Sequence, residues 1–249
     1  MRRGRATAAA FGLAGAAFGV GSASAGCAAM SFEGAGYVAC EFDARGDDIG
    51  VYWKDPDGNA YGGFGRLAES LKARGRTLAF AMNGGMFQRD LSPVGLFVEN
   101  GETKRRANTR DGAGNFHLKP NGVFWVGEGS AGVEETSRWL ARPPKARFAT
   151  QSGPMLVIDG RLHPGISPTG TSAKIRNGVG VRDSGKVVFA ISDEPVTFYA
   201  FARLFRDGLN APNALFLDGS VSTIYSPDVD RRGDFWSVGP IIGVTKPAS

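Results

Sequence analysis

The chain has 249 residues, of which 42% are hydrophobic and 21% are charged, and this balance is typical of a folded globular protein. Glycine is frequent, at 37 residues, but it follows no fixed period and does not gather in one tract. Collagen-like and low-complexity classes are therefore excluded.

Residues 1–25 have the pattern of a secretory signal peptide. Three arginines precede an apolar stretch at 6–20, and a run of small residues follows at 21–25. Removing this segment takes away three of the 29 basic residues and none of the 24 acidic ones, so the net charge falls from +5 to +2. We therefore expect no nucleic-acid partner, no transmembrane segment in the mature chain, and an exported protein that is periplasmic or secreted.

The two cysteines of the chain, Cys27 and Cys40, both follow the predicted cleavage site. In an oxidising compartment they predict a disulfide between the new N-terminus and the first strand. A lipid-modified Cys27 is the alternative, but residues 24–26 lack the leucine that usually precedes a lipidated cysteine. The disulfide is the favoured interpretation.

The first half of the chain predicts short strands and one amphipathic helix. Phe64, Leu67, Ala68 and Leu71 recur at helical spacing, and Gly75 follows as a helix-ending glycine. Asn100-Gly101 is a strong hairpin signal between two short runs. Apolar or alternating runs predict strands at 37–43, 49–53, 77–82, 94–98, 102–106 and 121–126.

The second half continues with strands around two more helices. A helix is predicted at 133–141, closed by Pro143-Pro144, and another at 198–209. Because strands outnumber helices and hairpins replace βαβ alternation, we expect an α+β fold. It would be a single strand-rich domain at 26–249, with a mixed or antiparallel sheet and a few packing helices. Further strands are predicted at 148–152, 155–158, 178–181, 186–192, 214–217, 222–225 and 238–244.

Two familiar kinds of site can be set aside. Residues 127–132 match G-x-G-x-x-G, but Glu128 would repel a pyrophosphate and no acidic residue lies ~20 positions further on. With His117 and His163 as the two histidines, a Ser-His-Asp hydrolase or a histidine-rich metal site is disfavoured. We expect no cofactor and no required metal, although Asp218 with backbone carbonyls could bind a hard cation.

Polar residues cluster where predicted strands end, and glycines lie beside them. Ends of strands on one rigid sheet can bring residues from separate segments into one cavity. Glycine permits sharp turns and close backbone approach there. The clusters are Asn83 with Gly84 and Gly85, Gln151 and Ser152 with Gly153, Arg176 and Asn177 with Gly178, and Asp218, Ser220 and Ser222 with Gly219.

These segments, in this order, resemble the phosphodiester glycosidase family. The resemblance rests on 83–87, 152–154, Arg176 with 179–180, and 217–220 with Ser222, and it extends from about Tyr37 to Val244. It implies an α+β domain with a surface active-site cavity, and an activity that cleaves a sugar from a phosphodiester. Animal members carry D-G-G-G-S where this chain has 218–222, and R-T-A where it has 176–178. Both departures bear on sugar specificity more than on the reaction class.

Such a substrate needs a cation for its phosphate and a carboxylate near its anomeric carbon. A departing phosphate monoester titrates near ~6, so strong acid assistance is less necessary than in ordinary glycosidases. We expect Arg176 to hold the phosphate, and Asp218 to act as nucleophile, base or electrostatic partner. Asn83 is the third catalytic candidate. Substrate-binding candidates are Gly84, Gly85, Gln151, Ser152, Gly153, Asn177, Gly219, Ser220 and Ser222.

Three alternatives remain open at this point. Arg176 and Asp218 could simply form a buried ion bridge. The protein could be a catalytically silent module that binds glycans or phosphorylated envelope polymers, or a metal-dependent phosphodiesterase, although few histidines disfavour a two-metal site. The expected partner is a sugar phosphodiester or a phosphorylated envelope glycan, and no oligomeric state is assigned.

Overall fold

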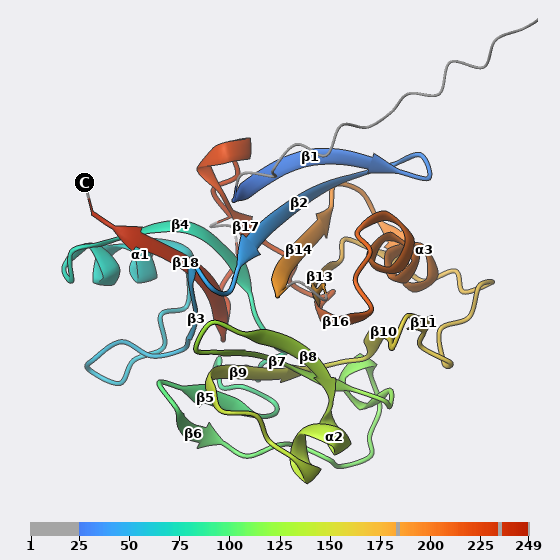
Figure 1. Ribbon diagram of the computed structural model, residues 1–249, viewed down its shortest axis with the longest axis horizontal. Coiled ribbons are helices and arrows are strands. Elements are labelled where there is room, and N and C mark those ends of the chain that lie inside the picture. The colour runs from blue at the N-terminus through green and yellow to red at the C-terminus, as the bar shows by residue number, and fades with distance from the viewer. Residues whose placement is uncertain (1–24, 183–184, 234–235, 249) are drawn as a thin grey trace, which may run out of the picture.

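The computed structural model describes residues 25–182, 185–233 and 236–248 (Figure 1). The predicted signal peptide therefore lies outside the described residues, apart from Ala25. Strands predominate over short helices in the described part of the chain, which confirms the expected α+β class. None of the helices described there is long and apolar enough to cross a bilayer.

The largest sheet has seven strands and is antiparallel throughout. Side chains of a strand alternate between its faces, so β14 contributes to two cores. Val187, Phe189 and Ile191 join the central core, while Val188 and Ala190 pack toward the helix α3 (Phe198–Arg203). The strand order is β1 (Gly26–Phe32), β2 (Ala35–Asp43), β14 (Lys186–Ser192), β13 (Asn177–Val181), β16 (Asn213–Asp218), β10 (Met155–Ile158) and β11 (Arg161–Leu162).

Two smaller antiparallel sheets enclose the central core from the other side (Figure 1). The four-stranded sheet carries α1 (Phe64–Lys72), whose apolar face is buried, and the five-stranded sheet carries α2 (Thr136–Ala141). The first has the order β17 (Ile224–Tyr225), β4 (Arg76–Asn83), β18 (Ile241–Pro247) and β3 (Asp48–Tyr52). The second has the order β6 (Glu102–Arg105), β5 (Phe97–Glu99), β9 (Ala146–Ser152), β7 (Gly122–Gly127) and β8 (Ala131–Glu135).

Short elements complete the chain between these sheets. They are the strand pair β12 (Ala173–Lys174) and β15 (Val196–Thr197), the 3₁₀ helices η1 (Asn115–His117) and η3 (Pro227–Val229), and the π-helical turn η2 (Leu204–Gly208).

The predicted disulfide is present. Cys27 and Cys40 face each other across β1 and β2 and are covalently joined. The bond therefore ties the first strand of the described chain to its neighbour within the same sheet.

Two differences from the predicted elements involve β8 and β1. The helix predicted at 133–141 is a strand up to Glu135, because Val133 pairs with Phe124 and is buried in the β7–β8 hairpin. The Gly-rich segment 127–132 spans the turn of that hairpin, and its ends belong to β7 and β8. No strand was predicted at 26–32, where β1 is largely solvent-accessible and shows no apolar run. Helix 198–209 is confirmed as α3, which continues into η2.

Candidate active site

Four strand ends meet at one edge of the central core. Asn83 ends β4, Ser152 ends β9, and Asp218 ends β16. Asn177 begins β13 and is directly opposite Asp218 in the antiparallel pair. The structure thus brings together residues from all four of the polar clusters found in the sequence.

Two buried asparagines hold the loop that follows β16. The Asn83 side chain donates to the Val221 carbonyl at 2.6 Å and accepts from the Thr223 amide at 2.9 Å. Asn177 donates to Oδ1 of Asn83 at 2.8 Å, and its own Oδ1 accepts from the amide of Asp218 at 3.1 Å. Both amide side chains are therefore engaged in fixing the backbone at 218–223.

Two serines support the same loop from its sides. The Ser152 hydroxyl donates to the Leu217 carbonyl at 2.7 Å, which joins β9 to β16. The Ser222 hydroxyl lies 2.7 Å from the Asp218 carbonyl and 3.1 Å from the Ile175 carbonyl. These contacts position Asp218 without occupying its carboxyl group.

Asp218 is a buried carboxyl at the start of this loop, with 7% of its surface exposed. Its Oδ1 accepts a hydrogen bond of 2.8 Å from the Ser220 amide. Burial raises the pKa of Asp218, and the backbone amides of residues 219–221 oppose that shift by favouring the charged form. A carboxyl with a raised pKa in a cleft is characteristic of catalytic sites.

Asp218 and Ser220 line a cavity of about 600 Å³. The same cavity is lined by the segment around η1, which contains Arg110 and His117. His117 donates through Nδ1 to the Arg110 carbonyl at 2.9 Å, which ties the two ends of this segment together. The other lining residues are Met86, Gln88, Val94, Asn108, Asp111, Ala113, Gly114, Asn115 and Phe116.

Arg110 and His117 were missed as site residues by the sequence analysis. They lie in an irregular loop whose hydrophobic pattern predicts neither helix nor strand. The local signal was the presence of both a cation and a histidine in a Gly- and Asn-rich segment. Arg110 forms no ion pair among the described residues.

Arg176 is buried directly behind the Asp218 loop, with 1% of its surface exposed. Its Nε donates to the Val196 carbonyl and its Nη2 to the Ser172 carbonyl, each at 2.8 Å. The guanidinium lies 3.6 Å from the centre of the Phe198 ring. Burial lowers its pKa to about 10, so the group stays charged at neutral pH.

Arg176 and Asp218 are neighbours that do not form an ion pair in the described part of the chain. A Cβ atom on Gly219 would lie 3.6 Å from Nη1 of Arg176, so the guanidinium lies close to the backbone of the loop. The buried ion bridge considered as an alternative from the sequence is absent. Arg176 instead places a positive charge behind the loop that presents Asp218.

Gln151 and the glycines lie in the packing around the cavity. Gln151 is buried, with Oε1 accepting from the amides of Leu96 and Asn108 and Nε2 donating to the Asn108 carbonyl at 2.9 Å. It thereby anchors Asn108, which lines the cavity.

The three glycines allow close contacts between chain segments. A Cβ atom on Gly84 would lie 3.2 Å from the Pro240 carbonyl oxygen, and one on Gly85 would lie 2.3 Å from the Gln151 carbonyl oxygen. A Cβ atom on Gly153 would lie 2.7 Å from Cβ of Asn121.

The described residues contain no cluster of three or more His, Cys, Asp and Glu side chains placed to hold a metal ion. The polar groups of the cavity are instead single donors and acceptors from separate segments.

A family model described as phosphodiester glycosidase matches residues 76–245, which include every strand end that forms the site. The chain belongs to the phosphodiester glycosidase family. Uncharacterized protein YigE of Escherichia coli (strain K12) is 37% identical over 177 residues, which cover 71% of this chain and 69% of that protein.

Solved structures confirm the phosphodiester glycosidase fold. The catalytic domain of zebrafish N-acetylglucosamine-1-phosphodiester alpha-N-acetylglucosaminidase, auto-inhibited by its pro-peptide, superposes with a TM-score of 0.60. It is 15% identical, and the match covers 88% of this chain and 81% of that chain. A Burkholderia pseudomallei protein with the printed name "Putative exported protein" has a TM-score of 0.51 at 12% identity, covering 84% of this chain and 74% of that chain.

Proposed function

We propose that the protein is an exported hydrolase that cleaves a sugar from a sugar 1-phosphodiester in the cavity beside Asp218. The observation that carries the proposal is the position of the Asp218 carboxyl. It is buried, held by backbone amides, and directed to a polar cavity of about 600 Å³ in a phosphodiester glycosidase chain.

Asp218 acts at the anomeric carbon in this proposal. Its carboxylate attacks that carbon, activates water, or stabilises the positive charge that develops as the phosphate departs. Because the phosphate monoester is a good leaving group, the bond to the anomeric carbon can break without a strong general acid. The reaction consumes water and releases the free sugar and the phosphate monoester.

The phosphate is stabilised by two arginines with different roles. Arg110 lines the cavity and has no ion-pair partner in the described chain, so its guanidinium is available to contact phosphate oxygens. Arg176 has Nε and Nη2 bonded to carbonyl groups, and in this proposal its positive charge, with Nη1 close to Gly219, stabilises the phosphate. The geometry of the loop depends on the hydrogen bonds of Asn83 and Asn177, which we assign positioning roles.

Product analysis with N-acetylglucosamine-1-phospho-6-mannose tests the reaction. The expected products are N-acetylglucosamine and mannose 6-phosphate. Asp218→Asn should reduce kcat at least ~100-fold, and Arg110→Gln should reduce kcat/KM by ~10-fold or more. The matched control is Arg66→Gln, an exposed arginine of α1 that lines no part of the cavity.

Running the reaction in ¹⁸O-labelled water distinguishes the alternatives. Cleavage at the anomeric carbon leaves the phosphate unlabelled, whereas a phosphodiesterase that attacks phosphorus places ¹⁸O in the phosphate. Labelled phosphate would therefore overturn the glycosidase proposal. Binding without turnover across a panel of sugar 1-phosphodiesters would instead identify a silent glycan-binding module.

Export is proposed from the signal-like residues 1–25, the Cys27–Cys40 disulfide and the likeness to a protein described as exported. Fractionation of expressing cells and N-terminal sequencing test it directly. A chain beginning at Gly26 in the periplasm or medium is expected. A chain that retains Met1 in the cytoplasm would contradict export.

A further inference from the structure

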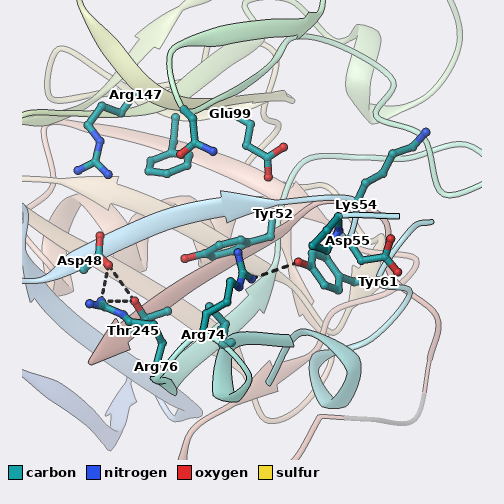
Figure 2. A pocket seen from close by; sticks show the side chains of 14 residues that line it. Asp48, Tyr52, Lys54, Asp55, Tyr61, Arg74, Arg76, Glu99, Arg147 and Thr245 are labelled. Atoms are coloured by element: carbon teal, nitrogen blue, oxygen red, sulfur yellow. Dashed lines mark hydrogen bonds and ion pairs between the residues drawn. The ribbon is translucent and has the colours of Figure 1, made fainter. Parts of the chain in front are cut away.

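A second polar cavity, of about 400 Å³, lies between α1, the four-stranded sheet and the five-stranded sheet (Figure 2). None of its lining residues lines the Asp218 cavity. Tyr52 comes from β3, Arg74 follows α1, Glu99 ends β5, and Arg147 comes from β9. Side chains of four separate elements therefore converge on one space.

The Tyr52 ring lies along the sheet beside this cavity. Gly50 and Gly243 are paired across β3 and β18, and neither has a side chain to occupy that part of the sheet face. A Cβ atom on Gly50 would lie 2.7 Å from the Tyr52 hydroxyl oxygen, and one on Gly243 would lie 3.2 Å from the edge of the ring. The glycine pair thus lets the half-buried ring lie flat and present an aromatic surface to the cavity.

Two arginines line this cavity together with the ring (Figure 2). Arg74 donates to the Ser70 carbonyl at 3.1 Å and to the Tyr61 hydroxyl at 3.4 Å, and Arg147 lies over the Phe148 ring at 5.3 Å. Neither forms an ion pair among the described residues, whereas their neighbour Arg76 is paired with Asp48. The cavity therefore has two positive groups available for an anion.

Glu99 supplies an acceptor on the same side as Arg147 (Figure 2). Burial raises the pKa of its carboxyl, and the nearby charge of Arg74 acts in the opposite direction. No hydrogen bond or ion pair engages this carboxyl within the described chain. A carboxylate beside a flat aromatic ring is a suitable acceptor for the hydroxyl groups of a sugar.

We propose that this cavity binds an anionic monosaccharide unit, with its ring stacked on Tyr52, its phosphate or carboxylate held by Arg74 and Arg147, and its hydroxyl groups donating to Glu99. The site is separate from the Asp218 cavity and does not depend on the reaction proposed there. On a polymeric glycan it would hold a unit remote from the bond that is cleaved.

Chemical-shift mapping tests this site directly. Glucose 6-phosphate, glucuronate, glucose and inorganic phosphate are titrated into ¹⁵N-labelled Asp218→Asn protein, in which turnover is suppressed. At least one of the two anionic sugars should shift the amides of Tyr52, Asn100 and Arg147, and do so at lower concentration than glucose or phosphate. Arg147→Gln and Arg74→Gln should each weaken this binding by ~10-fold, and Arg110→Gln should change it less than twofold.

Tyr52→Leu separates sugar recognition from simple anion binding. It should remove the preference for the anionic sugar over inorganic phosphate, while the spectrum remains that of a folded protein. Equal affinity of the wild-type site for inorganic phosphate and the anionic sugars would overturn the proposal. Saturable shifts confined to amides around Ser220 and Asn115 would also overturn it, because they would assign all sugar binding to the Asp218 cavity.

Discussion

The side chain of Asn177 donates a hydrogen bond of 2.8 Å to the side chain of Asn83, 94 positions earlier in the chain. This bond joins β13 of the seven-stranded sheet to β4 of the four-stranded sheet. Both residues also bind the backbone of the loop after β16, so the pair connects two sheets and the candidate catalytic loop.

Replacing Asn83 by leucine should therefore destabilise the protein. The substitution leaves the Val221 carbonyl, the Thr223 amide and the Asn177 side chain without their partners in a buried region. The expected loss is about 2–4 kcal/mol in the free energy of unfolding, measured by urea denaturation. Asn59→Ala, at an exposed loop position, should change stability by less than ~0.5 kcal/mol. Equal effects of the two variants would contradict the role assigned to Asn83.

Asp218→Asn should show a stability difference that depends on pH. The folded-state pKa of Asp218 lies above its ordinary value of 3.8, so the folded protein binds more protons than the unfolded chain just above that pH. The contribution of Asp218 to stability then falls as the pH rises from 3.8 through the raised folded value. The asparagine variant lacks this penalty.

We accordingly expect Asp218→Asn to be at least as stable as the wild type at pH 7 while losing activity. Its relative advantage should shrink as the pH falls through the raised folded-state pKa of Asp218 toward 3.8, and should not change further below that pH. Thermal unfolding of both proteins between pH 3 and 8 provides the comparison. A variant that becomes relatively less stable as the pH rises would show that hydrogen bonding to the carboxylate outweighs its burial.

Arg176→Lys should weaken the protein although it retains the positive charge. A lysine ammonium lacks the planar fork that reaches the carbonyl groups of both Ser172 and Val196 and covers the Phe198 ring. A loss of about 1–3 kcal/mol is expected in chemical denaturation. The matched control is Arg138→Lys, since Arg138 forms an exposed ion pair with Asp159 and should change stability by less than ~1 kcal/mol.

Gly85→Ala tests the close approach of two chain segments beside the site. An alanine Cβ would lie 2.3 Å from the Gln151 carbonyl oxygen and 2.6 Å from the Thr150 hydroxyl, so β4 and β9 would have to separate. We expect a destabilisation of more than ~2 kcal/mol and weaker catalysis. Gly46→Ala meets no atom within 4 Å and should be nearly neutral in the same thermal assay. Near-neutral behaviour of both variants would rule out a tight contact at Gly85.

Strands that consist of one continuous apolar run were predictable from the sequence. The runs in β4, β10 and β14 are continuous and apolar because both faces of these strands are buried, and their bounds agree closely with prediction. The exposed strand β1 lacked that signal. β8 was mistaken for the start of a helix because the spacing of Val133 and Trp139 did not show that Val133 belongs to a hairpin.

The site residues likewise separate into those that the local sequence pattern reveals and those that it does not. Local sequence marks Asn83, Ser152, Asn177 and Asp218, because a polar residue at the end of a buried strand stands out against its neighbours. Arg110 and His117 lie in an irregular loop, and a loop has no period that reveals which surface it covers.

The sequence by itself determined the α+β class, the disulfide pairing, the family and most of the strand ends that form the site. Tertiary structure alone decided that Arg176 lies beside Gly219 without an ion pair to Asp218, and that Arg110 and His117 line the same cavity as that carboxyl. It also decided that the ring of Tyr52 lies over a glycine pair. These relationships depend on contacts between segments far apart in the chain, and such contacts are set by how the sheets pack rather than by local composition.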